Sequence, residues 1–132
     1  MDDLYREVII EHYNNPSHRG SLDPHTIKFA DNNPLCGDHI EITLITDDSG
    51  KITDAKFDGH GCSISQATAD ILLDDVIGKN VDQVKTLTKD DIIDLIGIEP
   101  GPVRLKCALL SLKVLKAGIY GLTSADDVEV DE

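Results

Sequence analysis

Polar and apolar residues alternate between positions 39 and 46, which is the pattern of a strand with one buried face. Residues 47–50, Asp-Asp-Ser-Gly, have turn chemistry, and 51–58 form a return strand. Because Ile52 is out of phase with the apolar residues that follow it, we expect a bulge near Thr53. The pattern therefore predicts a β-hairpin. The apolar residues that we expect on the buried face of its first strand are Ile40, Ile42 and Leu44.

Helical periodicity accounts for most of the remaining chain. A first helix, begun by Asp2 and Asp3, is expected to end at Asn14-Asn15-Pro16. Ser63 and Gln66 have the spacing of a capping box, and Gly78 ends the helix that they begin. Asn80 and Thr88 are expected to cap two short helices. Outside the hairpin, the sequence predicts a short strand over 26–30 and helices over 2–14, 63–77, 89–96 and 103–119. A further short helix is expected directly after Asn80.

The segment 103–119 is apolar over most of its circumference, so we expect it to be the central, buried helix. Its three lysines, Lys106, Lys113 and Lys116, fall on one narrow ridge. For Lys106, the sequence leaves open whether it is only a solvated lysine on this ridge or has a role beyond favouring the neighbouring thiolate.

The three cysteines lie in loops or near a helix start, and the predicted hairpin brings two of them together. Cys36 precedes the first strand and Cys62 follows the second, and a hairpin places its outer ends side by side. Asp38 follows Cys36 by two residues, and Cys107 falls in about the first turn of the last helix. Three thiolates and one carboxylate make a complete ligand set for zinc or for the edge of an iron–sulfur cluster.

The surroundings of these cysteines favour thiols that are ionised and accessible. Cys62 precedes a helix N-terminus, where the dipole favours a thiolate, and Arg104 and Lys106 lie beside Cys107. The alternative is that the cysteines are small buried residues. Because the sequence contains no Cys-x-x-Cys pair, spacing alone leaves both interpretations open.

Charge and hydropathy narrow the class of protein. Twelve basic residues against 25 acidic ones give a net charge of −13, which argues against a nucleic-acid partner. The acidity is suited to a partner with a basic docking face, although solubility alone would also explain it. No apolar run reaches the roughly 18 residues of a membrane span, and the acidic N-terminus is not a secretory signal. We therefore expect a cytoplasmic protein with no membrane segment.

Three motifs in order resemble the IscU/SufU/NifU-N-terminal family of iron–sulfur cluster assembly proteins. They are Pro-x-Cys-Gly-Asp at 34–38, Asp-Ala-Lys-Phe-x-Gly-x-Gly-Cys-Ser-Ile-Ser at 54–65 and Lys-Cys-Ala-Leu-Leu at 106–110. The segment 11–16, Glu-His-Tyr-Asn-Asn-Pro, is also similar to the family. The resemblance extends from Tyr5 to about Ile119.

The resemblance implies an α+β fold, a SufE/NifU-like α/β sandwich in which helices pack on a small, mostly antiparallel three-stranded sheet. It implies one domain over 1–122, followed by an acidic tail over 123–132. It also implies a scaffold that accepts persulfide sulfur from a cysteine desulfurase, assembles a transient [2Fe–2S] cluster and transfers it to apo-proteins. The residues that would hold the cluster or a zinc ion are Cys36, Asp38, Cys62 and Cys107.

The resemblance further makes Cys107 the persulfide acceptor, since thiolate attack requires exposure as well as ionisation. One residue departs from the IscU pattern: Lys106 stands where IscU-type scaffolds have histidine. Lysine at this position resembles SufU-type proteins, which are similar to zinc-dependent sulfurtransferases that relay persulfide. The short connection from Cys62 to Cys107 is nevertheless IscU-like. The scaffold is therefore our first hypothesis, and the sulfur relay is the alternative.

Overall fold

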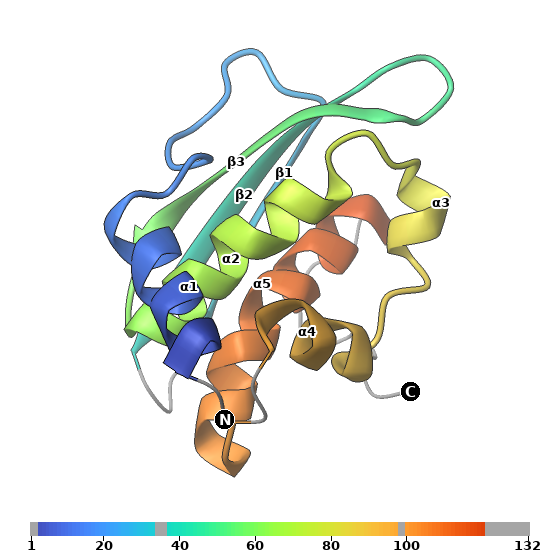
Figure 1. The fold of residues 1–132 in the computed structure, drawn as a ribbon. Helices are drawn as coiled ribbons and strands as arrows, with labels where there is room; N and C mark the ends of the chain where they lie inside the picture. Colours follow the sequence, from blue (N-terminus) through green and yellow to red (C-terminus); the bar gives the residue numbers. More distant parts are fainter. Residues whose placement is uncertain (1–2, 34–36, 98–99, 121–132) are drawn as a thin grey trace.

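The computed structural model describes residues 3–33, 37–97 and 100–120, and these form a three-stranded sheet with helices against it (Figure 1). None of the helices in these residues has the length and the apolar content that crossing a membrane requires. The elements, in chain order, are α1 (Asp3–Asn14), β1 (Ile27–Asn33), β2 (Asp38–Thr46), β3 (Ile52–His60), α2 (Ser63–Val76), α3 (Val81–Val84), α4 (Lys89–Ile96) and α5 (Pro102–Tyr120).

The strands form an antiparallel sheet in the order β1-β2-β3. The predicted hairpin is confirmed, and so is its bulge: Ile45 pairs with Asp54 while Thr46 pairs with Ile52, which leaves Thr53 as the extra residue. Strand β1 runs three residues beyond the segment 26–30 expected from its pattern. The pairing of β1 with β2 continues to Asn33, opposite Asp38, because every residue of β1 has a partner in β2.

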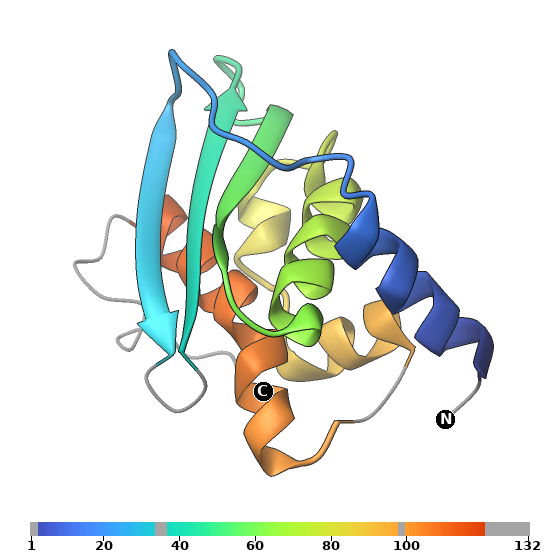
Figure 2. The same cartoon turned by 90° about the vertical axis from the view of Figure 1, so that its left-hand side faces the viewer.

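Helices α2 and α5 lie against one face of the sheet, and α1 and α4 lie outside them (Figures 1 and 2). The expectation that the last helix is central is confirmed, since its middle residues are buried between the sheet and the other helices. Burial of this apolar surface is the main stabilising contribution to the fold. The largest fully buried side chains include Ile40, Leu44, Phe57, Leu72, Leu73, Leu112 and Leu115.

Helix α1 is joined to α2 by a buried carboxylate. Asp70 of α2 is fully buried, and its Oδ2 lies 2.6 Å from His12 Nδ1 of α1. Its Oδ1 accepts a hydrogen bond of 2.9 Å from the His18 backbone N–H. A buried carboxylate is tolerated only when its oxygens are satisfied in this way. His12 therefore packs at the contact between α1 and α2.

The predicted helix caps have a mixed outcome. Asn80 and Thr88 are N-caps of α3 and α4, as expected from the sequence. The capping box predicted for Ser63 and Gln66 is wrong, because α2 begins at Ser63 and its N-cap is Cys62, which makes no side-chain cap bond. The Gln66 side chain instead accepts a hydrogen bond from Arg19 and donates one to Ser65.

The lysine ridge of α5 is only partly solvated. Lys106 is exposed, as a solvated lysine would be, whereas Lys116 at the inner end of the ridge is 5% exposed. Burial lowers the pKa of Lys116 below its ordinary value, and the attraction of Asp91 on α4 opposes that change. The predicted acidic tail over 123–132 lies outside the described residues.

Candidate metal centre

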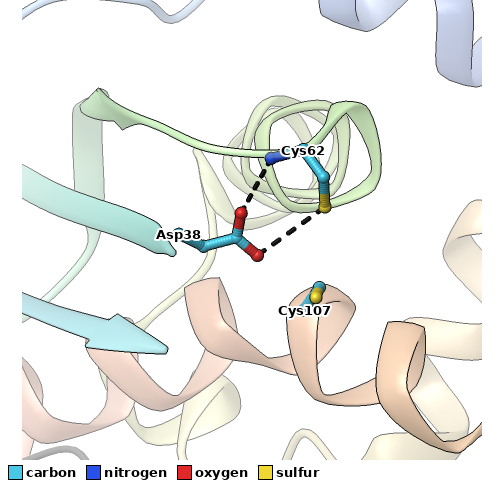
Figure 3. A group of neighbouring side chains, drawn as sticks. All are labelled: Asp38, Cys62 and Cys107. Carbon is cyan, nitrogen blue, oxygen red and sulfur yellow. Dashed lines mark hydrogen bonds between the residues drawn. The ribbon is translucent and has the colours of Figure 1, made fainter. Parts of the chain in front are cut away.

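Three of the four proposed ligands fall in the described residues, and they lie together where β1 and β2 meet the starts of α2 and α5. Asp38 is the first residue of β2, Cys62 is the N-cap of α2, and Cys107 lies in α5 (Figure 3). One donor atom from each residue falls within 4.8 Å of the other two. The fourth proposed ligand, Cys36, lies outside the described residues.

Asp38 binds Cys62 through both of its carboxylate oxygens. The carboxylate is fully buried, and Oδ1 accepts a hydrogen bond of 2.7 Å from the Cys62 backbone N–H. The Cys62 thiol donates to Oδ2 over 3.6 Å. The first bond satisfies an N–H at the start of α2, where a negative charge is also favoured by the helix dipole. The second marks a place where a metal ion could replace the thiol proton between sulfur and oxygen.

Two glycines allow the end of β3 to approach the start of β2 this closely. Gly59 has a φ of 141° and Gly61 a φ of 144°, which L side chains rarely adopt. A Cβ atom on Gly61 would collide with the Asp38 carboxylate, and one on Gly59 would collide with the His39 carbonyl. The Gly-x-Gly sequence before Cys62 is therefore required by packing as well as by backbone conformation.

Cys107 differs from the sequence-based expectation. It lies in the second turn of α5 and is only 2% exposed, so the prediction of an accessible thiol is wrong for this residue. Helix α5 begins at Pro102 and packs against β1, so Cys107, its sixth residue, is covered by the end of the sheet. Its sulfur is 4.0 Å from Nδ2 of Asn33, a buried residue at the end of β1. Cys62 is partly exposed and is the more accessible of these two thiols.

Lys106 is exposed on the solvent side of α5, although it is adjacent to Cys107 in the sequence. A protonated amine has no lone pair to offer a metal ion. The observed exposure therefore agrees with a ligand set that omits Lys106.

Sequence reasoning missed Arg19, which holds the loop that carries Cys62. Its guanidinium donates to the Gly59 carbonyl at 2.5 Å and to Gln66 Oε1 at 3.2 Å, and it lies 3.2 Å from the Asp58 carboxylate. These contacts join the end of β3 to the first turn of α2 around the residues that precede Cys62. The sequence gives no signal for this role, because Arg19 lies in an irregular segment about forty residues earlier.

The donor set fits a zinc ion. Zinc binds thiolate sulfur at about 2.3 Å and carboxylate oxygen at about 2.0–2.2 Å, so tetrahedral donors lie roughly 3.5–3.8 Å apart. The Cys62 sulfur and Asp38 Oδ2 are already 3.6 Å apart, and Cys107 completes a group within 4.8 Å. Small side-chain rotations would bring all three donors onto one ion. A mixed set of soft sulfur and hard oxygen also suits iron.

Comparison with known proteins shows the family of this chain. The model of the NifU-like N-terminal domain family matches residues 4–126. The zinc-dependent sulfurtransferase SufU of Bacillus subtilis is 39% identical, over 90% of this chain and 91% of the relative. The iron–sulfur cluster assembly scaffold protein IscU of Thermotoga maritima is 33% identical, over 88% of this chain and 92% of the relative.

The fold agrees with the same group of proteins. The crystal structure of FiSufU from Fervidobacterium islandicum, described as a scaffold protein of iron–sulfur cluster assembly for the SUF system, superposes with a TM-score of 0.76. The sequences are 26% identical, and the match covers 86% of this chain and 94% of that one. The α+β fold expected from the sequence is confirmed by this neighbour and by the three-stranded antiparallel sheet. The chain belongs to the NifU-like N-terminal domain family.

Proposed function

We propose that this protein is an iron–sulfur cluster assembly scaffold that accepts sulfur from a cysteine desulfurase, assembles a [2Fe–2S] cluster and transfers it. The observation that carries the proposal is the convergence of Asp38, Cys62 and Cys107 from three separate elements to within 4.8 Å. Cys36, two residues before Asp38, would be the fourth ligand. When a zinc ion is bound instead, these residues hold the site in a resting form.

The chemistry of the ligands supports a site that releases its cargo. A carboxylate binds iron less firmly than a thiolate does, because iron–sulfur clusters are held mainly by soft sulfur ligands. Asp38 therefore supplies one weak bond in an otherwise strong set. The partial exposure of Cys62 leaves one side of the group open to a recipient protein. A purely structural zinc site would be closed on all sides.

The experiment that tests this function is anaerobic reconstitution with a cysteine desulfurase, cysteine and ferrous iron, followed by visible absorption. We expect a [2Fe–2S] spectrum that decays as an added apo-ferredoxin gains activity. Apo-ferredoxin that remains inactive beside a fully loaded protein would contradict transfer.

The second candidate function is a zinc-dependent sulfur relay, as in the SufU relative. The observation that favours it is Lys106, which stands beside Cys107 and is exposed. The 39% identity to SufU, against 33% to the Thermotoga IscU, points the same way. In the reconstitution experiment, a colourless protein that keeps one zinc ion and accelerates the desulfurase would establish this function in place of the scaffold.

Substitution of Asp38 is expected to slow cluster loss. In Asp38→Ala the weak oxygen ligand is gone, so the half-time of the cluster in air should rise several-fold. The change also removes the acceptor of the Cys62 N–H bond, at a cost of about 1–3 kcal/mol. Asp38→Asn is the matched control, because its amide oxygen can keep that bond without offering an anionic ligand. A half-time that is unchanged in both variants would count against this role for Asp38.

A further inference from the structure

Two histidines lie side by side on the sheet, next to the candidate metal centre but outside it. His39 of β2 pairs directly with His60 of β3, so both side chains project from the same face. Their rings stack with centroids 5.7 Å apart and an angle of 26° between the planes. Since the neighbouring residue Ile40 points into the core, the imidazoles lie on the face opposite to α2 and α5.

Two carboxylates flank the histidine pair. Glu41 and Asp58 form a cross-strand pair two residues further along the same strands, and therefore lie on the same face. A hollow of about 290 Å³ is lined by the two histidines, the two carboxylates and Gly59. This hollow thus gathers two imidazoles and two carboxylates, which are the side chains that bind divalent transition metals most readily after cysteine.

The hydrogen bond of His39 uses Nδ1 and leaves Nε2 for a metal ion. Its Nδ1 lies 2.6 Å from the Asn32 side-chain oxygen, which can only accept. A neutral His39 ring that donates to this oxygen carries its proton on Nδ1 and its lone pair on Nε2. Metal-binding histidines are typically oriented in this way, with the second nitrogen donating to an oxygen. His60 is exposed, so its ring can turn to place a nitrogen beside that of His39.

Of the two carboxylates, Glu41 is the better third ligand. Asp58 already lies 3.2 Å from the Arg19 guanidinium, which also holds the Gly59 carbonyl. The contacts of Glu41 are longer: 3.3 Å to the Ser21 hydroxyl and 3.7 Å to the Lys28 ammonium. Its side chain is also longer, so it can reach an ion bound between the two rings.

We propose that His39, His60 and Glu41 form a second metal site, which takes a divalent transition-metal ion such as Zn²⁺ or Fe²⁺. Zinc binds imidazole nitrogen at about 2.0–2.1 Å and in the plane of the ring, so the exposed His60 ring must turn out of the stack before both rings can bind one ion. Water completes the coordination, because the hollow is open to solvent. The site contains no sulfur and does not depend on the proposed scaffold function.

The test uses the full chain, titrated anaerobically with ¹¹³Cd²⁺ and observed by cadmium NMR. The chemical shift separates an ion bound by thiolates from one bound by nitrogen and oxygen. We expect a nitrogen- and oxygen-ligated resonance that disappears in His60→Ala, while the thiolate resonance remains. Zinc binding to this site, measured by calorimetry on protein already loaded with one zinc ion, should weaken by about ten-fold or more in the same variant.

One control variant and one further ligand variant complete the test of the second site. His25→Ala removes an exposed histidine from the loop before β1 and should leave both resonances unchanged. Glu41→Gln should weaken the second site without removing the thiolate resonance. The proposal would be overturned if the parent protein gave no nitrogen- and oxygen-ligated resonance, or if that resonance persisted in His60→Ala. If only the thiolate resonance were missing, the result would count against the proposed scaffold function and would not affect the proposal of the second site.

Discussion

A Cys107→Ser variant is expected to accept no sulfur from a cysteine desulfurase while it keeps the fold of the parent protein. A hydroxyl cannot attack a persulfide as a thiolate does, so labelling should fall to background. The serine Oγ is smaller than sulfur and lies beyond hydrogen-bond distance of the Asn33 amide, whose nitrogen is 4.0 Å from the sulfur, so one small buried hydroxyl loses this partner. We therefore expect a loss of stability of only about 1–2 kcal/mol. The measurement is mass spectrometry of peptides after incubation with desulfurase and ³⁴S-cysteine.

Cys62→Ser is the matched control, because it makes the same chemical change within the same group of ligands. It should lose metal affinity but retain labelled sulfur on Cys107. The 2% exposure of Cys107 makes this comparison informative, since Cys62 is the easier thiol to reach. If persulfide formed normally on Cys62 in the Cys107→Ser variant, the more exposed thiol would be the sulfur acceptor, and the role that the family resemblance implies for Cys107 would be wrong.

The features predicted correctly from the sequence are those that depend on neighbouring residues. The alternation over 39–46 and the phase change at Ile52 are local patterns, and they were sufficient for the hairpin and for its bulge at Thr53. The caps at Asn80 and Thr88 are also local signals. The hairpin also accounts for the proximity of Asp38, the first residue of β2, to Cys62, two residues after β3. The predicted proximity of Cys36 to Cys62 lies outside the described residues.

The features that the sequence did not predict depend on what packs over each residue. The burial of Cys107 arises from its place under the end of the sheet, and that of Lys116 arises from helix packing around α5. Ser63 fails as a cap because the backbone of Cys62, held by Asp38, already occupies the N-cap position. Tertiary contacts override a local propensity in each case. The role of Arg19 has the same origin, since it acts on a loop distant in sequence.

A Gly61→Ala variant is expected to lose both stability and metal binding. The φ of 144° costs about 1–3 kcal/mol for a residue with a side chain. The new methyl group would also collide with the Asp38 carboxylate, which must move away from the Cys62 N–H bond at a further cost of about 1–3 kcal/mol. Since Asp38 orients Cys62, zinc affinity should fall by about ten-fold or more. Urea unfolding of the metal-free protein and competition with a chromogenic chelator measure the two effects.

Gly78→Ala separates backbone strain from the collision. Gly78 follows α2 with a φ of 95°, and a Cβ there would meet no atom within 4 Å. Its substitution should cost about 1–3 kcal/mol from strain alone and leave zinc affinity unchanged. A Gly61→Ala protein that is no less stable than Gly78→Ala, and that binds zinc like the parent, would contradict this account. The close approach of β2 and β3 would then be unnecessary for the metal centre, and Gly61 would be required only for the backbone conformation before Cys62.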